Sequence, residues 1–199
     1  MQVNVGTVPG QAAEAEVLVD LNGNPIIFGS QNTTIATYNV TVNDVTPAAL
    51  ATDVLTLSGS ATKTISITRI KITADASGAC EVDFYAYKRI APNTGGTVTH
   101  PAIVKYDSLN SAPTAVVNLY SANPLVLGAG TLFAGSQFIV PGTSGNTWLP
   151  VVPVIVDYGT RNNQAIVLRG VNESIAISLN GNTVPAGLGL YITIEWTES

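Results

Sequence analysis

The side chains that could perform chemistry are few and widely separated. His100 is the only histidine and Cys80 the only cysteine, which argues against a zinc site and rules out an internal disulfide. A nucleophilic triad or dyad would have to use His100, which lies in a Thr-His-Pro segment without a nucleophile elbow. Cys80 falls on the apolar side of its predicted strand, as an inert buried thiol would.

Two carboxylates are enough for a glycosidase, and Glu81 and Asp83 share the solvent-facing parity of one strand. Solvated surface side chains are the commoner explanation of such a pair. The glycines form no phosphate-binding motif, and no run of acidic residues has the spacing of a calcium loop. We therefore predict that the chain is not an enzyme, with no catalytic residue, no bound metal and no cofactor.

The charge distribution limits the partners. The net charge is −5, and the eight basic residues are scattered, which argues against direct nucleic-acid binding. No stretch is long and apolar enough for a membrane span, and the first residues lack the pattern of an export signal. We expect a soluble protein, synthesised in a cytoplasm, that contacts no membrane.

Charged residues make up only 11% of the chain, against about 25% in an ordinary soluble domain. Surfaces buried between subunits are depleted of charge at their centres. The deficit therefore predicts a homo-oligomer with extensive subunit contacts. The alternative is a threonine-rich β-surface that tolerates the lack of charge without a partner.

Segment 53–90 predicts three consecutive strands and organises the chain. In the middle strand, Ile65 and Ile67 share one parity, whereas Ile70 and Ile72 share the other. One inserted residue near Thr68 would return all four side chains to a single face, as a β-bulge does. The alternative is a strand buried on both faces.

Alternation is clear in two further strands. In the strand that begins near Cys80, apolar side chains alternate with a second set: Glu81, Asp83, Tyr85 and Tyr87. In the last strand, Trp196 shares its parity with Leu188, Leu190, Ile192 and Ile194, which predicts that Trp196 is a core residue.

The remaining chain contains short strand patterns separated by turns. About ten strands are predicted, with no long helix; residues 46–51 form a loop or one helical turn, and Pro153 marks an edge or bulged strand. This pattern predicts an all-β fold, a jelly-roll-like antiparallel β-sandwich over residues 32–199.

Residues 1–31 differ from the rest, because turn-forming residues interrupt them every few positions. A short strand is possible within residues 16–21. We predict an extended N-terminal arm that binds a partner through isolated apolar side chains, namely Val17, Val19, Ile26, Ile27 and Phe28.

Aromatic side chains are the other candidates for binding. Tyr85 and Tyr87 lie two positions apart on one strand face, and Trp148 lies near a strand end, as do Tyr38, Tyr106 and Tyr120. Such rings stack on sugars or fill interface pockets. Packing between the sheets is the alternative for each residue.

Several segments resemble small β-rich proteins encoded among the virion genes of tailed bacteriophages. They include Ala165–Gly170, Ser178–Gly187 and Ile194–Glu198, together with Ser58–Ile70 and Asn93–Thr97. The resemblance covers about the last two-thirds of the chain and carries no catalytic motif.

The resemblance implies a virion structural protein that decorates and cements a capsid, with the major capsid protein and further copies of itself as partners, a trimer being preferred. The implied location is the capsid surface. The alternative is a receptor- or carbohydrate-binding module of a phage head or tail fibre.

Overall fold

The computed structural model describes residues 18–19, 25–26, 35–141, 152–158 and 164–199 of the chain. The chain divides into two compact units, residues 1–34 and residues 35–199. In the first unit, β1 (Leu18–Val19) pairs antiparallel with β2 (Pro25–Ile26). β1 lies within the segment 16–21 suggested for a strand, and the other residues of that segment lie outside the described ranges.

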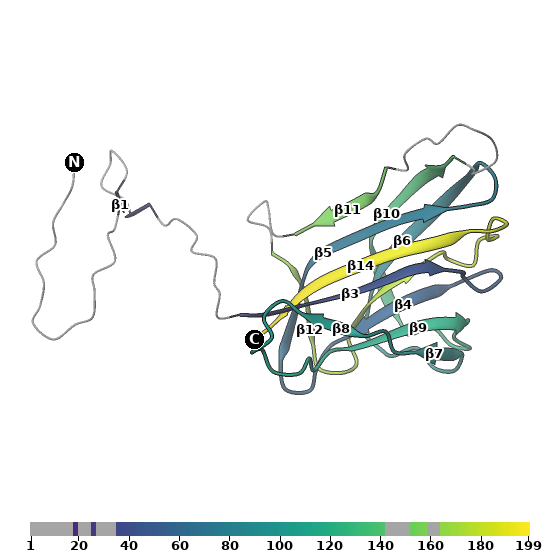
Figure 1. Ribbon diagram of the computed structural model, residues 1–199. Helices are drawn as coiled ribbons and strands as arrows, with labels where there is room; N and C mark the ends of the chain where they lie inside the picture. The colour runs from purple at the N-terminus through teal and green to yellow at the C-terminus, as the bar shows by residue number, and fades with distance from the viewer. Residues whose placement is uncertain (1–17, 20–24, 27–34, 142–151, 159–163) are drawn as a thin grey trace, which may run out of the picture. The chain divides into compact units, whose positions relative to one another are not determined.

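The described part of the second unit contains strands and loops but no helix (Figure 1). Its strands are β3 (Ala36–Val45), β4 (Asp53–Ser58), β5 (Thr64–Asp75), β6 (Cys80–Arg89), β7 (Thr97–Thr99), β8 (Ile103–Lys105), β9 (Val116–Ala122), β10 (Gly130–Val140), β11 (Val154–Asp157), β12 (Ile166–Arg169), β13 (Ser174–Ser178) and β14 (Gly189–Glu198).

The strands form two sheets that pack face to face as a sandwich, which confirms the predicted fold class. One sheet has the order β10-β6-β13-β4-β9-β7, and the other has the order β11-β5-β14-β3-β8 with β12 also paired to β5. All the strand pairs described are antiparallel. Because β3 to β6 fall in alternating sheets, as do β13 and β14, consecutive strands repeatedly cross between the layers.

The bulge predicted in β5 is present. Glu195 of β14 lies opposite Arg69, whereas the next residue, Trp196, lies opposite Ile67, so Thr68 has no partner in the ladder. Its hydroxyl instead donates to the carbonyl oxygen of Glu195 at 3.2 Å. As a result the four isoleucines of β5 all reach the core, each at most 1% exposed, which excludes a strand buried on both faces.

Trp196 is a core residue, as its parity predicted. It is fully buried and stacks on Tyr38 with ring centroids 5.9 Å apart. Its indole nitrogen donates to Glu198 at 3.1 Å, which satisfies the only polar atom of the ring. Tyr38 was expected among the exposed aromatics and is instead fully buried, because it lies opposite Trp196 in the β3–β14 ladder.

The connections differ from expectation in one place. Residues 46–51 form a loop, one of the two alternatives for them, whereas the long segment 91–114 contains β7 in addition to the short strand expected near residues 102–106. The strand after Pro153 is an edge strand, as predicted, because β11 lies at the end of its sheet.

Candidate interaction surface

The groups considered for catalysis do not come together. Nδ1 of His100 lies 3.0 Å from the carbonyl oxygen of Val117, a contact within the fold. Cys80, expected to be buried, is half-buried at the start of β6, and burial raises the pKa of its thiol. No group of three or more potential metal ligands occurs among the described residues.

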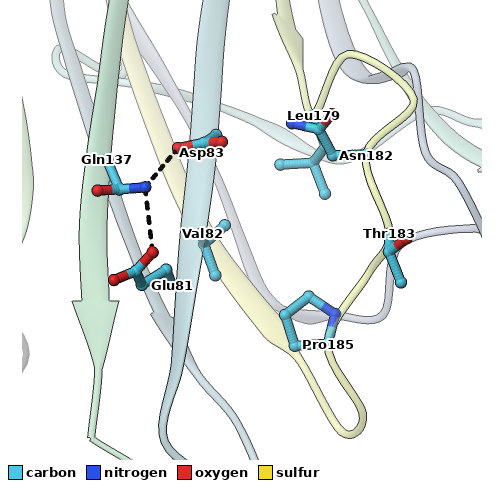
Figure 2. Close-up of a pocket in the computed structure, with 8 residues that line it drawn as sticks. All are labelled: Glu81, Val82, Asp83, Gln137, Leu179, Asn182, Thr183 and Pro185. Atoms are coloured by element: carbon cyan, nitrogen blue, oxygen red, sulfur yellow. Dashed lines mark hydrogen bonds between the residues drawn. The ribbon is translucent and has the colours of Figure 1, made fainter.

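Glu81 and Asp83 lie on one face of β6, beside Gln137 of β10. The Gln137 amide nitrogen donates to both carboxylates, at 3.4 Å and 3.0 Å (Figure 2). These three side chains line one side of a pocket of about 250 Å³, and the loop around Asn182 and Pro185 lines the other. The Gln137 amide that bridges the two carboxylates is itself neither an acid nor a base.

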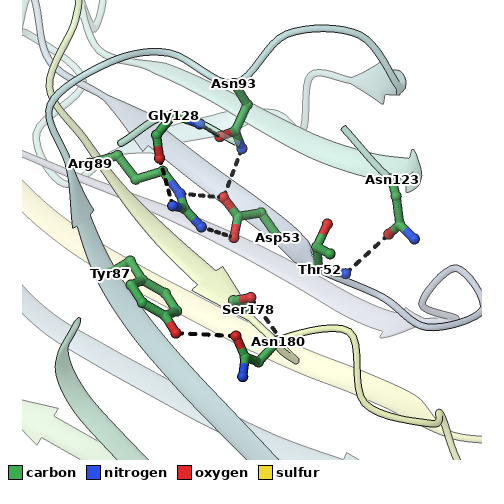
Figure 3. Close-up of polar contacts among 9 residues, drawn as sticks. All are labelled: Thr52, Asp53, Tyr87, Arg89, Asn93, Asn123, Gly128, Ser178 and Asn180. Atoms are coloured by element: carbon green, nitrogen blue, oxygen red, sulfur yellow. Dashed lines mark hydrogen bonds and ion pairs between the residues drawn. The ribbon is translucent and has the colours of Figure 1, made fainter. Parts of the chain in front are cut away.

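A buried polar network lies on the outer face of the same sheet. The β4–β13 register shifts between Ile177 and Ser178, which leaves Val54 without a ladder partner and places Asp53 opposite Ser178. Asp53 accepts hydrogen bonds from Nε and Nη2 of Arg89, both at 2.6 Å, although only 1% of the residue is exposed (Figure 3). This bidentate pair is the strongest form of a carboxylate–guanidinium contact.

The network ties two loops to the sheet. Asn93, in the β6–β7 connection, donates to Asp53 at 2.7 Å and accepts from the backbone nitrogen of Gly128 at 2.8 Å. Nη1 of Arg89 donates to the carbonyl oxygen of Gly128, which lies in the β9–β10 connection, at 2.8 Å. A Cβ atom on Gly128 would clash with the carbonyl of Ala91, so only glycine allows this close approach.

The two loops also bond to each other and to the β3–β4 connection. Thr94 and Val126 form an isolated antiparallel bridge, with N···O distances of 2.9 Å and 3.1 Å. The Leu125 side chain lies against Gly95, whose φ of +73° favours glycine. Asn123 donates to the carbonyl oxygens of Ala49 and Leu50, at 3.1 Å and 3.2 Å.

Large apolar side chains project from these bonded loops. Leu125 is 84% exposed, Ile90 64% and Val126 61%, although the backbone that carries them is held by the buried network. We call this set of five residues the apolar loop surface: Leu50, Ile90, Leu125, Val126 and Leu127. A rigid backbone that presents apolar side chains loses little entropy on binding, which favours a protein partner.

The residues predicted for binding have mixed outcomes. Tyr85 and Tyr87 are half-buried on the outer face of β6, with ring centroids 6.5 Å apart. The Tyr87 hydroxyl donates to Asn180 at 3.2 Å, and the Arg89 guanidinium lies over the Tyr87 ring. Tyr106 is 56% exposed, whereas Tyr120 is buried, contrary to the expectation for an exposed aromatic.

Only two of the arm residues predicted to bind a partner fall within the described ranges. Val19 and Ile26 belong to β1 and β2, which pair with each other. Val17, Ile27, Phe28 and Trp148 lie outside the described residues. Their role in binding stays a prediction.

Comparison with known proteins identifies no relative. No protein-family model, no curated protein and no solved structure matches the chain.

Proposed function

We propose that the chain is a non-enzymatic virion structural protein that decorates and stabilises a bacteriophage capsid. The observation that carries the proposal is the apolar loop surface on a charge-poor β-sandwich. Apolar side chains on a braced backbone are suited to lasting contact with another protein, whereas the potential catalytic groups of the described residues are dispersed or engaged in structural contacts.

The strand order supports a jelly roll, the architecture that the resemblance implies. Four strands of one sheet, β10-β6-β13-β4, face four of the other, β11-β5-β14-β3, and the chain alternates between the layers as in a pair of Greek keys. We infer that β7, β8 and β9 are additions at the sheet edges. β7 follows the β6–β7 connection and β9 precedes the β9–β10 connection, and these two connections carry most of the apolar loop surface.

Attachment to the major capsid protein would use two elements. The apolar loop surface supplies a preformed contact, and residues 1–31 act as an arm that adds a strand to a neighbouring sheet edge. We propose that the protein acts as a homo-oligomer on the capsid surface, for which the resemblance implies a trimer. No helix able to span a membrane occurs in the described ranges.

A receptor- or carbohydrate-binding module is the second candidate. It is favoured by Tyr85 and Tyr87, whose neighbouring rings lie on an outer sheet face, where the Tyr87 hydroxyl donates to the amide oxygen of Asn180. Aromatic rings beside amide groups suit sugar recognition. Glycan-array binding that depends on Tyr85 would favour this module over the capsid role.

Co-sedimentation with empty phage capsids tests the primary proposal. We expect the parent protein to pellet with the capsids and the Leu125→Asp, Val126→Asp double variant to remain in the supernatant, because two charges would be buried at the contact. Val171→Asp is the matched control, since Val171 is 57% exposed outside the apolar loop surface. Equal pelleting of the double variant would contradict the role of these loops, and a parent protein that does not pellet would contradict the proposal itself.

A further inference from the structure

The four edges of the two sheets differ in how well they are protected against pairing with another strand. Free backbone groups on an edge strand attract other strands, and proteins limit this with short strands, charges, prolines and bulges. β7 and β8 are three residues long, and β8 includes Lys105. β11 and β12, which share the fourth edge, are four residues long and include Asp157 and Arg169, respectively.

β10 lacks most of these protections. It is an edge strand of 11 residues, Gly130–Val140, with no charged residue and no proline. Among the described residues, β6 is the only strand that pairs with it. A bulge at Phe133 interrupts the ladder between Leu132 and Ala134, so the regular part of the edge is Ala134–Val140.

We propose that Ala134–Val140 pairs antiparallel with the same segment of a second copy of this chain, joining two sheets across a two-fold axis. The strand is self-complementary for this contact, because it places no like charges opposite each other. The regular segment is centred on Gln137, so this register sets Gly135 opposite Ile139 of the second copy.

The side chains on the outer face fit that register. Ile139 is 68% exposed. Gly135 lies beside the ring of Tyr85, and a Cβ atom added to Gly135 would lie 3.4 Å from that ring. In the pair, Ile139 of one copy covers Gly135 and the adjacent Tyr85 ring of the other. The contact therefore buries apolar surface together with edge backbone groups that pair with no other described strand.

A two-fold contact of this kind produces an even-numbered assembly, in contrast to the trimer that the resemblance implies. The inference does not depend on the proposed function, because self-association can be measured without a capsid. A protein that pairs through β10 but binds no capsid would contradict the proposed function alone.

Sedimentation velocity over a range of concentrations provides the test. We expect the parent protein to form dimers or an even multiple, and the Ser136→Lys, Ile139→Lys double variant to dissociate, with a dimer Kd raised roughly tenfold or more. Both positions are exposed, so the fold should remain. Thr99→Lys with Val104→Lys, at exposed positions of the β7 and β8 edges, is the matched control and should assemble as the parent does.

A cross-linking variant checks the register even if the lysine variant folds poorly. In a Cys80→Ser background, Gln137→Cys places two thiols directly opposite each other across the two-fold axis, and a short thiol-to-thiol reagent should join them into a covalent dimer. Val104→Cys should give none. A monomeric parent, an assembly unchanged by the β10 lysines, or no cross-link at residue 137 would each overturn the inference.

Discussion

Replacing Asp53 with asparagine removes one charge from the buried network and changes the volume very little. The Arg89 guanidinium then remains buried without a carboxylate. In the parent protein its Nε and Nη2 both donate to Asp53 at 2.6 Å, and the two side chains are 7% and 0% exposed, so water cannot replace the lost partner. Breaking a buried pair in this way costs about 3–5 kcal/mol of unfolding free energy, a large part of the stability of a typical domain.

Urea unfolding followed by circular dichroism measures this cost. Glu173→Gln is the matched control, because the Lys88–Glu173 pair is 3.2 Å long but its side chains are 36% and 27% exposed. An exposed pair contributes about 0–1 kcal/mol. Adding Arg89→Met to Asp53→Asn should recover part of the loss, since the unpaired charge is then removed.

Two results would refute this reasoning. A cost for Asp53→Asn no larger than that of Glu173→Gln would mean that the network does not hold the loops. A double variant less stable than Asp53→Asn would mean that the arginine contributes through packing and not through its charge.

Four further predictions concern the core, the arm, the absence of catalysis and the ionisation of Tyr158. Trp196→Ala should lower the unfolding free energy by about 3–5 kcal/mol, and a melting temperature equal to the parent's would contradict its core role. Deleting residues 1–31 should leave a cooperatively folded domain, as judged by calorimetry, while abolishing capsid co-sedimentation; an unfolded product would assign the arm to the domain's own core. Hydrolysis of esters, peptides and polysaccharides should stay at background and be unchanged in Glu81→Gln and Asp83→Asn, so turnover lost in either variant would contradict the structural role. Burial raises the pKa of Tyr158 to about 12, whereas an unfolded tyrosine titrates near pH 10. The contribution of this shift to stability is therefore complete below about pH 10 and is lost as the pH rises to about 12. Urea titrations at several pH values should show a smaller loss of unfolding free energy over this range for Tyr158→Phe than for the parent.

Much of the fold could be predicted because alternation directly reflects burial on a sheet. The change of parity between Ile67 and Ile70 indicated the bulge at Thr68, and the parity of Trp196 indicated a core position. Tyr38 was misassigned because its neighbours in the sequence resemble a strand end. Only the pairing of β3 with β14 brings it onto Trp196.

The polar network could not be predicted, because its members come from two strands and two connections that are far apart in the sequence. Asp53 and Arg89 are 36 residues apart, and Asp53 turns to the outer face only through the bulge at Val54. One signal was present in the sequence. Asn93 lies in the turn-rich segment before β7, and Gly128 lies in the one after β9. A long connection of this kind has to pack against another part of the protein.

Electron cryomicroscopy of the particles of a phage whose genome encodes this chain tests the central claim most directly. A decoration protein predicts density for the β-sandwich repeated over the shell lattice, with the apolar loop surface facing the major capsid protein. Density confined to the tail or its fibres, or particles from which the chain is absent, would contradict the claim.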